Sequence, residues 1–465
     1  MNMINVRRLT VMTFLGASML SGISAQVSPL QVDTLKETKI PDQWDLQSCI
    51  DYAKEQNITI RKNRITAAST QIDVKTAKAA LFPSLSFSTG QQVVNRPYQE
   101  TSSRVSGSEI ISSNSKTSYN GNYGLNASWT LYNGNKRLKT IQQEKLNNQM
   151  AELDVATSEN NIQESITQVY IQILYAAESV KVNENTLQVS IAQRDRGQEL
   201  LNAGSIAKSD LAQLEAQVST DRYQLVTAQA TLEDYKLQLK QLLELDGENE
   251  MNIYLPALSD ENVLAPLPTK RDVYISALSL RPEIEASKLN VEASELGINI
   301  AKSSYFPTIS LSAGIGTNHT SGSDFTFGEQ VKNGWNNSIG LSISVPIFNN
   351  RQTKSAVQKA KLQYETSMLS LLDEQKALYK TIESLWLDAN SAQQRYAAAN
   401  EKLKSTQISY ELISEQFNLG MKNTIELLTE KNNLLQAQQE QLQAKYMAIL
   451  NTQLLKFYQG DQLAL

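Results

Sequence analysis

The sequence feature that most restricts the fold is an apolar seam along the stretch from Lys354 to Gln416, which contains no Pro or Gly. Residues of the seam are spaced alternately by three and four, and all but two are apolar: Leu371, Gln375, Leu378, Ile382, Leu385, Ala389, Ala392, Tyr396, Ala399, Leu403, Thr406, Tyr410, Ile413 and Phe417. A repeat of 3.5 residues is typical of long helices that supercoil and bury a narrow stripe against a neighbour. A helix from Asn350 to Leu419 would be roughly 100 Å long, several times the width of an ordinary domain.

The same seam occurs twice in the chain. Subtracting 216 from each seam position gives a second, mostly apolar string within residues 155–201. The offset of 216 also relates Gly204 to Gly420, and an offset of 224 relates Pro83 to Pro307. We therefore predict two tandem copies of one unit, in residues 45–245 and 271–458, joined by a Pro-containing linker at 246–270 and followed by a tail at 459–465.

The first 25 residues are expected to be an export signal. Arg7 and Arg8 precede an apolar core at residues 9–20, and the small residues Ser24 and Ala25 suit a cleavage site. A membrane anchor is the weaker alternative, because the apolar run is about a dozen residues and a span needs about 20. The mature chain would then begin with an extended segment at residues 26–44.

Between the helices the hydrophobic pattern changes to a period of two, which indicates β-strands. Strands are expected at about 84–95 and 119–132 in the first copy, and at about 308–318 and 335–348 in the second. Pro83 and Pro307 end the preceding helices, because proline lacks a donor and restricts the residue before it. Aromatic residues are expected at the strand ends nearest the helices, like an interfacial girdle: Phe82, Trp129, Tyr132, Phe306, Trp335 and Phe348.

Each predicted strand has one apolar face and one face of small polar residues. Four such strands cannot close, and an open sheet edge is untenable in lipid, so further copies of the chain are expected to complete a barrel. Two copies give eight strands with a filled interior, whereas three give twelve strands and an open lumen. The small polar face favours water inside. The alternative is the half-buried sheet of a soluble domain, which has the same period.

After each long helix the chain is expected to reverse direction at a tip, at about residues 201–208 and 417–424, and to return as a second helix. Gly204 and Gly420 suit helix C-caps. Ser209-Asp210 and Asn423-Thr424 would open the return helices.

Composition argues against several classes of protein. A net charge of -5 without a basic cluster argues against nucleic acid as a partner. The single Cys and single His leave little for metal binding or nucleophilic catalysis, so we expect no enzyme activity, no metal and no cofactor. Cys49 is interpreted as a small packing residue and His319 as a solvated loop residue.

The order of helix, hairpin, long helix, tip and return helix, repeated behind a signal, resembles the TolC family of outer-membrane efflux proteins, the outer membrane factors. Further similarities are Trp44-Asp45-Leu46, Arg281-Pro282-Glu283-Ile284, and Phe82-Pro83 with its twin Phe306-Pro307. The resemblance implies a homotrimer in outer-membrane lipid, with a twelve-stranded transmembrane β-barrel and an α-helical barrel through the periplasm. It also implies a periplasmic adaptor (membrane fusion protein) and an inner-membrane pump or ABC exporter as partners.

The implied function is a passive exit duct of a tripartite efflux or type I secretion system, gated at its periplasmic tips. The alternative is a periplasmic coiled-coil adaptor or scaffold whose sheets are soluble.

The resemblance places the gate at Asp210, Lys422 and Phe417, with an acidic ring at Glu426. Lys stands where an Arg is expected and Phe where a Tyr is expected, so a bidentate fork and a hydroxyl are lost. The second acidic position falls on Thr429. The alternative for Asp210 and Glu426 is ordinary capping and dipole compensation at helix N-termini.

Overall fold

The computed structural model describes residues 41–98, 102–106, 109–113, 116–246, 251–256, 263–321, 323 and 325–463. The chain divides into two units, Met1–Asp42 and Gln43–Leu465. The predicted export signal and most of the extended segment after it lie outside the described residues. The fold below is that of the second unit.

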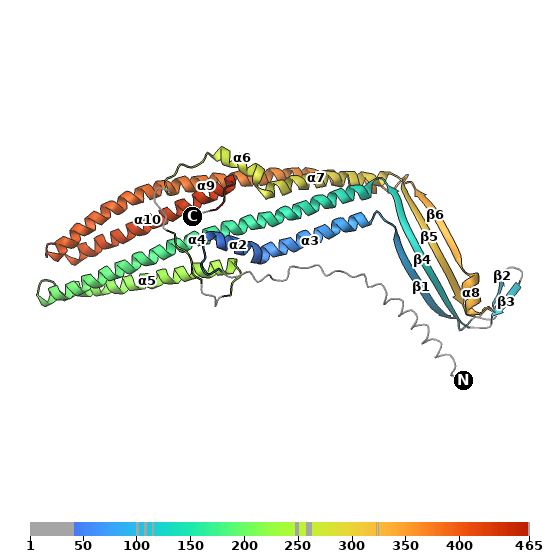
Figure 1. The fold of residues 1–465 in the computed structure, drawn as a ribbon, viewed down its shortest axis with the longest axis horizontal. Coiled ribbons are helices and arrows are strands. Elements are labelled where there is room, and N and C mark those ends of the chain that lie inside the picture. Colours follow the sequence, from blue (N-terminus) through green and yellow to red (C-terminus); the bar gives the residue numbers. More distant parts are fainter. Residues whose placement is uncertain are drawn as a thin grey trace, which may run out of the picture. The chain divides into compact units, whose positions relative to one another are not determined.

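The two halves of this unit contain corresponding elements in the same order (Figure 1). The first half consists of α2 (Leu46–Gln56), α3 (Ile58–Ala79), β1 (Ser84–Asn95), β4 (Thr117–Asn133), α4 (Lys136–Asn202) and α5 (Lys208–Leu242). The second consists of α6 (Lys270–Leu280), α7 (Pro282–Lys302), β5 (Thr308–Thr320), β6 (Asn336–Ser344), α9 (Gln352–Asn418) and α10 (Thr424–Gln459). Shorter elements are β2 (Ser102–Ser106), β3 (Glu109–Ser113), the 3-10 turn Ser303–Tyr305 and α8 (Phe327–Asn333).

The long helices α4 and α9 each contain 67 residues. Each follows two residues in the left-handed region, Gly134 and Asn135 before α4, and Asn350 and Arg351 before α9. The first of these turns joins β4 directly to α4, and the second starts α9 after the segment that follows β6. No helix within the described ranges is both long enough and apolar enough to cross a membrane.

Helix α4 occupies the middle of the helical part. It packs against α3 and α7 on the side of the sheet and against α5 and α10 on the side of the tips, while α9 packs against α7 and α10. One buried cluster, around Trp44, Tyr170 and Tyr396, joins α2, α4, α9 and α10. A second, around Val273, Ile284 and Ile382, joins α6, α7 and α9. The apolar seams are therefore buried between neighbouring helices of one chain.

The four principal strands form one antiparallel sheet in the order β1-β4-β5-β6. Its two edges are β1 and β6. The register shifts between Thr130 and Tyr132, as at a β-bulge. Strand β6 ends at Ser344, short of the predicted end at residue 348, because Pro346 has no N–H for the ladder.

Two expectations about single residues are wrong. His319 is not a solvated loop residue: it lies in β5, is 9% exposed, and its ring packs against Tyr119, Tyr123 and Phe327. Strand β5 continues past residue 318, and Phe327 of α8 covers the imidazole. Trp335 is not at the helix end of the sheet. It precedes β6, at the opposite end, because β6 runs back toward α9.

Candidate functional site

The sheet separates apolar from polar side chains row by row. Side chains of directly paired residues in antiparallel strands share a face, and successive rows alternate. One row across all four strands consists of Leu85, Ala127, Ala313 and Ile339. The adjacent row consists of Ser86, Asn126, Gly314 and Ser338. One face of the sheet is thus apolar and the other is lined by small polar groups.

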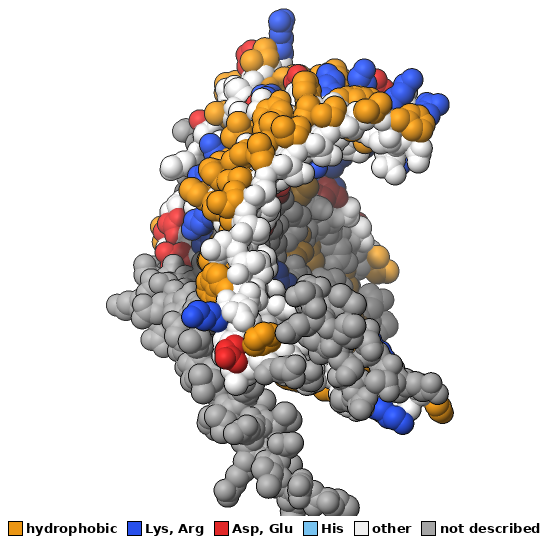
Figure 2. All heavy atoms as spheres, turned by 90° about the vertical axis from the view of Figure 1, so that its right-hand side faces the viewer, with side chains coloured by type: hydrophobic (Ala, Val, Ile, Leu, Met, Phe, Trp, Pro, Cys, Tyr) orange, Lys and Arg blue, Asp and Glu red, His pale blue; other side chains and the backbone are white. Residues whose placement is uncertain are grey.

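Large apolar side chains on the sheet are uncovered in the single chain. Phe87 is 68% exposed, Ile339 83% and Leu341 61%. Figure 2, which views the sheet end of the molecule, shows hydrophobic side chains on the outer side of a curved surface whose hollowed side is mostly polar. A contiguous apolar face of this kind marks a surface that contacts lipid or protein.

The junctions between helices and strands are fixed by named contacts. Pro83 and Pro307 directly precede β1 and β5. Arg137, in the first turn of α4, donates to the carbonyl oxygens of Ala80 and Thr130. Trp129 Nε1 donates to the Leu81 carbonyl at 2.8 Å. The strands are thereby attached to α3 and α4 by short turns.

The tips are built by the predicted glycines. Gly204 and Gly420 both have φ near +74°, a left-handed conformation in which a Cβ is strained, although no atom lies within 4 Å of a Cβ built at either position. The Ser205 N–H donates to the Leu200 carbonyl at 2.8 Å, which satisfies a terminal carbonyl of α4. The same pattern follows α9. Backbone conformation, rather than lack of space, is the reason for glycine at both tips.

Of the predicted gate residues, the structure joins Lys422 to Glu426 but does not join Asp210 to Lys422. Asp210 is the third residue of α5, and its Oδ2 accepts from the Ala207 N–H at 3.0 Å. Helix α5 begins at Lys208 with Ala207 as its N-cap, before the Ser209-Asp210 pair that was expected to open it. Lys422 Nζ lies 2.6 Å from Glu426 Oε1. Within the part of the chain that the structure describes, Asp210 and Lys422 form no ion pair with each other.

Glu426 belongs to a complete capping box. The Asn423 N–H donates to Glu426 Oε2, and the Glu426 N–H donates to Asn423 Oδ1 at 2.9 Å. Lys422, by its hydrogen bond, and the Asn423 N–H together lower the pKa of Glu426 from its usual value. Phe417, in the last turn of α9, is 3% exposed. In the single chain Lys422, Glu426 and Phe417 thus stabilise the tip between α9 and α10.

Sequence reasoning missed a buried charged cluster near the tips. Lys431 of α10 forms an ion pair with Asp221 of α5, and Ser190 of α4 contacts both. Gln217 donates to the second carboxylate oxygen at 2.9 Å. A signal was present: Asp221 continues the three-four spacing of Leu211, Leu214 and Val218, and Lys431 that of Leu427 and Leu434. Charges at seam positions in both return helices could have indicated the contact.

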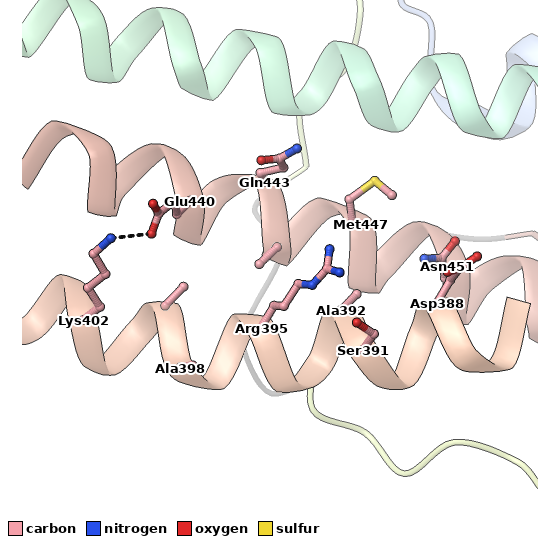
Figure 3. Close-up of a pocket in the computed structure, with 12 residues that line it drawn as sticks. Asp388, Ser391, Ala392, Arg395, Ala398, Lys402, Glu440, Gln443, Met447 and Asn451 are labelled. Carbon is pink, nitrogen blue, oxygen red and sulfur yellow. Dashed lines mark hydrogen bonds and ion pairs between the residues drawn. The ribbon is translucent and has the colours of Figure 1, made fainter. Parts of the chain in front are cut away.

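A groove of about 550 Å³ lies between α9 and α10 (Figure 3). Lys402 and Glu440 form an ion pair of 2.7 Å at one end, and Arg395 extends from α9 between the two helices. Small side chains form much of the floor: Ala392, Ala398, Ala399 and Ala444. Among the described residues, no group of three or more His, Cys, Asp or Glu side chains is placed to hold a metal ion.

The sequence profile of the family described as "Outer membrane efflux protein" matches residues 49–244 and 273–460. The chain belongs to this family. The predicted family membership and the predicted outer-membrane location are thereby confirmed.

Individual relatives are distant. The chain is 23% identical over 299 residues to outer membrane efflux protein BepC of Brucella suis, covering 64% of this chain and 62% of that protein. It is 24% identical over 291 residues to outer membrane protein TolC of Escherichia coli K12, covering 61% and 58%. The chain therefore spans about three fifths of the length of these relatives.

Solved structures share the fold over most of the chain. The channel CusC superimposes with a TM-score of 0.75 at 19% identity, covering 90% of this chain and 92% of that one. VceC of Vibrio cholerae superimposes with a TM-score of 0.72 at 16% identity, covering 90% and 97%.

Proposed function

We propose that the chain is a passive outer-membrane channel, the exit duct of a tripartite efflux or type I secretion system. The observation that carries the proposal is the two-faced sheet, with its apolar side chains exposed and its small polar side chains on the opposite face. An apolar exterior suits lipid and a polar interior suits water. The helices continue from the same end of the sheet, so the water-filled path would extend along them.

Closure requires more than one chain. Strands β1 and β6 each have only one neighbour in the described sheet, so each leaves a row of backbone groups unpaired. Pairing β6 of one copy with β1 of the next satisfies both rows. Three copies would give twelve strands, enough for an open lumen, whereas two would give a filled barrel.

The names of the relatives indicate export systems of several components, but they do not agree on one exported substrate. They include "Toxin and drug export protein A" of Aggregatibacter actinomycetemcomitans, "Alkaline protease secretion protein AprF" of Pseudomonas aeruginosa and "Cation efflux system protein CusC" of Escherichia coli. A passive duct takes its specificity from the complex that feeds it. We therefore propose a periplasmic adaptor and an inner-membrane pump or exporter as partners.

We place the gate at the tips, with Asp210, Lys422, Phe417 and Glu426 as its residues. The support is their position: all four lie within one or two turns of Gly204 or Gly420, at the end of the helices away from the sheet. In the single chain Asp210 and Glu426 accept capping hydrogen bonds, and Phe417 is buried. Lys422 forms an ion pair with Glu426. Contacts between copies would therefore act on tips that are already well ordered.

Planar-bilayer recording of the purified protein, together with its native mass in detergent, tests the proposal. We expect discrete channels and a mass of three chains. A monomer that stays folded without detergent and forms no channels would instead support the periplasmic scaffold.

A further inference from the structure

Helix α8 packs on the apolar face of the sheet, at the end away from the long helices (Figure 1). Thr317 Oγ1 of β5 donates to the Val331 carbonyl at 2.7 Å, and the His319 ring makes an edge contact with Phe327, their centroids 4.9 Å apart. Thr317 and His319 follow Ala313 by four and six residues, so their side chains share its apolar face. The helix therefore covers part of the surface that is proposed to face lipid.

The imidazole of His319 has room beneath α8 because its partner on β4 is a glycine. A Cβ built at Gly121 would lie 2.2 Å from His319 Cε1, too close for both groups to fit. The rings of Tyr119 and Tyr123 lie beside the imidazole, with centroids 5.3 and 6.0 Å away. Gln91 of β1 pairs with Gly121 in the same row. Since neither Gln91 nor His319 is apolar, this row would end the apolar face if α8 did not cover it.

The height of α8 on the sheet matches one border of a lipid-facing band. Ile309, which pairs with Tyr132 at the helix end of the sheet, precedes His319 by ten residues. Ten residues of strand are about 33 Å long and, tilted by about 40°, rise by roughly 25 Å. The outward apolar band of a membrane barrel is about 25 Å tall and has aromatic residues at both borders. With Tyr132 at one border, His319 and α8 lie at the other.

Large aromatic side chains on and beside α8 are uncovered. Phe325 is 57% exposed, Phe327 43% and Trp335 56%. Phe325 precedes the helix by two residues and Trp335 follows it by two. Amphipathic aromatic rings are enriched at the level of lipid headgroups, where one part of the ring meets acyl chains and another meets polar groups.

We infer that α8 is a lipid-contacting helix, which places Phe325, Phe327 and Trp335 among the acyl chains next to the outer-leaflet headgroups. This inference rests on the proposed channel. The partner is lipid, because the exposed rings continue the apolar face of the sheet and lie one band height from Tyr132. His319 positions the helix: it is buried and contacts Phe327.

Tryptophan quenching in vesicles tests the inference. Trp44 and Trp386 belong to the helical part, so Trp129→Phe leaves Trp335 as the reporter beside the sheet. In phosphatidylcholine brominated near the headgroup end of its acyl chains, Trp335 should lose about half of its fluorescence, and aqueous iodide should quench it little. The variant Trp129→Phe/Trp335→Phe gives the background.

A matched control moves the reporter to the other face of the sheet. In Trp129→Phe/Trp335→Phe/Asn336→Trp the introduced ring lies in the row of Gly316, on the polar face. Iodide should quench it, and brominated lipid should not. Iodide quenching of Trp335 as strong as that of the control would place Trp335 in water, and protection from both quenchers would place it against protein. Either result would overturn the inference.

The variant Trp335→Phe separates the inference from the proposed channel. It leaves Trp129, which is bonded to the Leu81 carbonyl at the helix end of the sheet, as the reporter. Quenching of Trp129 but not of Trp335 by brominated lipid refutes only the inference about α8. Quenching of neither refutes the membrane-spanning sheet itself.

The role of His319 has a test of its own, in which Trp129→Phe/Trp335→Phe/Phe325→Trp puts the reporter next to the start of α8. Adding His319→Ala should raise iodide quenching severalfold, because α8 loses the ring that it packs against. Adding His319→Phe should not, since it supplies a ring of similar size. Iodide quenching that is unchanged by His319→Ala would show that His319 does not position the helix.

Discussion

Lys431 on α10 and Asp221 on α5 form an ion pair whose side chains are only 4% and 1% exposed. Ser190 on α4 contacts both side chains. The two helical hairpins of one chain, α4–α5 and α9–α10, therefore meet at a single charged contact. Removing two charges from water is costly, and their attraction offsets this only while both are present. The cluster therefore penalises any movement that separates the two hairpins within a copy.

Lys431→Met should destabilise the protein by about 3–5 kcal/mol, because it leaves the Asp221 carboxylate buried without its partner. Asp221→Leu/Lys431→Met should recover most of that loss, since two apolar residues replace both charges. Guanidinium unfolding in detergent measures the difference. Lys402→Met is the matched control: its partner Glu440 is exposed, so the expected change is at most about 1 kcal/mol. Equal effects of both single variants would contradict the prediction.

Asp210→Ala/Lys422→Ala should raise the open probability or conductance of the channel while the trimer stays folded. If the closed trimer pairs Asp210 with Lys422 at three equivalent places, and each exposed pair contributes about 0.5–1 kcal/mol, removing them would change the open population by roughly tenfold to a hundredfold. Bilayer recordings at low and high salt measure this. The control Glu233→Ala/Lys236→Ala removes an exposed pair on α5 away from the tip and should change nothing. Unchanged currents would show that Asp210 and Lys422 only stabilise the tips of their own chain.

Acid should loosen the start of α10. The pKa of Glu426 is lowered in the folded protein, so its contribution is complete above its ordinary pKa of 4.5 and is lost as the pH falls through the lower folded value. Amide-exchange protection of residues 423–427, corrected for intrinsic rates, should therefore decrease below about pH 4.5. Glu426→Gln, whose side-chain oxygen can still accept from the Asn423 N–H, should show a protection that does not change over this pH range. A wild-type profile parallel to that of Glu426→Gln would exclude this carboxylate as the titrating group.

Cys49 should be unreactive while the protein is folded. Burial is the main cause that raises its pKa from 9.0 to about 12, and the prediction that it is a packing residue is confirmed by its 0% exposure. Because the folded pKa is the higher one, the associated stability is present below pH 9 and is lost as the pH rises toward 12. Maleimide at pH 8 should label no thiol in the native protein and one after denaturation. Labelling of the native protein would mean that the α2 region opens easily.

The helical part was predictable because its signals are local and repeated. A period of 3.5 over the stretch to Phe417 specifies a long helix, and Gly204 and Gly420 mark where the chain must reverse. The alternation of the strands likewise predicted one sheet with an apolar and a polar face. These features depend on spacing alone.

Contacts between distant segments were not predictable in this way. His319 is buried because α8 folds over β5, and a segment of Thr, Asn and Ser gives no sign of that. The pairing of Lys431 with Asp221 requires knowing that α10 lies beside α4 and α5. Asp210 and Glu426 could be assigned to a gate or to caps from sequence, and the structure shows their capping bonds within one chain.

The strongest test of the membrane assignment uses two neighbouring residues of β6. Leu341 belongs to the row that contains Trp129 and Leu311, on the apolar face, whereas Ser342 belongs to the next row with Ser310. Leu341→Lys puts a charge into lipid at a cost of about 2–4 kcal/mol per chain near the bilayer midplane, which three copies multiply. Ser342→Lys puts the same charge into water.

We therefore expect Leu341→Lys to reduce the amount of folded trimer in outer-membrane fractions severalfold, and Ser342→Lys to leave that amount unchanged while altering ion selectivity. Heat-modified migration on gels measures assembly, and reversal potentials in a salt gradient measure selectivity. Because the two positions are adjacent on one edge strand and receive the same side chain, a general effect of lysine on this strand would lower assembly in both variants. Equal losses in both variants would mean that both faces of the sheet are packed against protein, as in a soluble scaffold. That result would contradict the assignment of the apolar face to lipid.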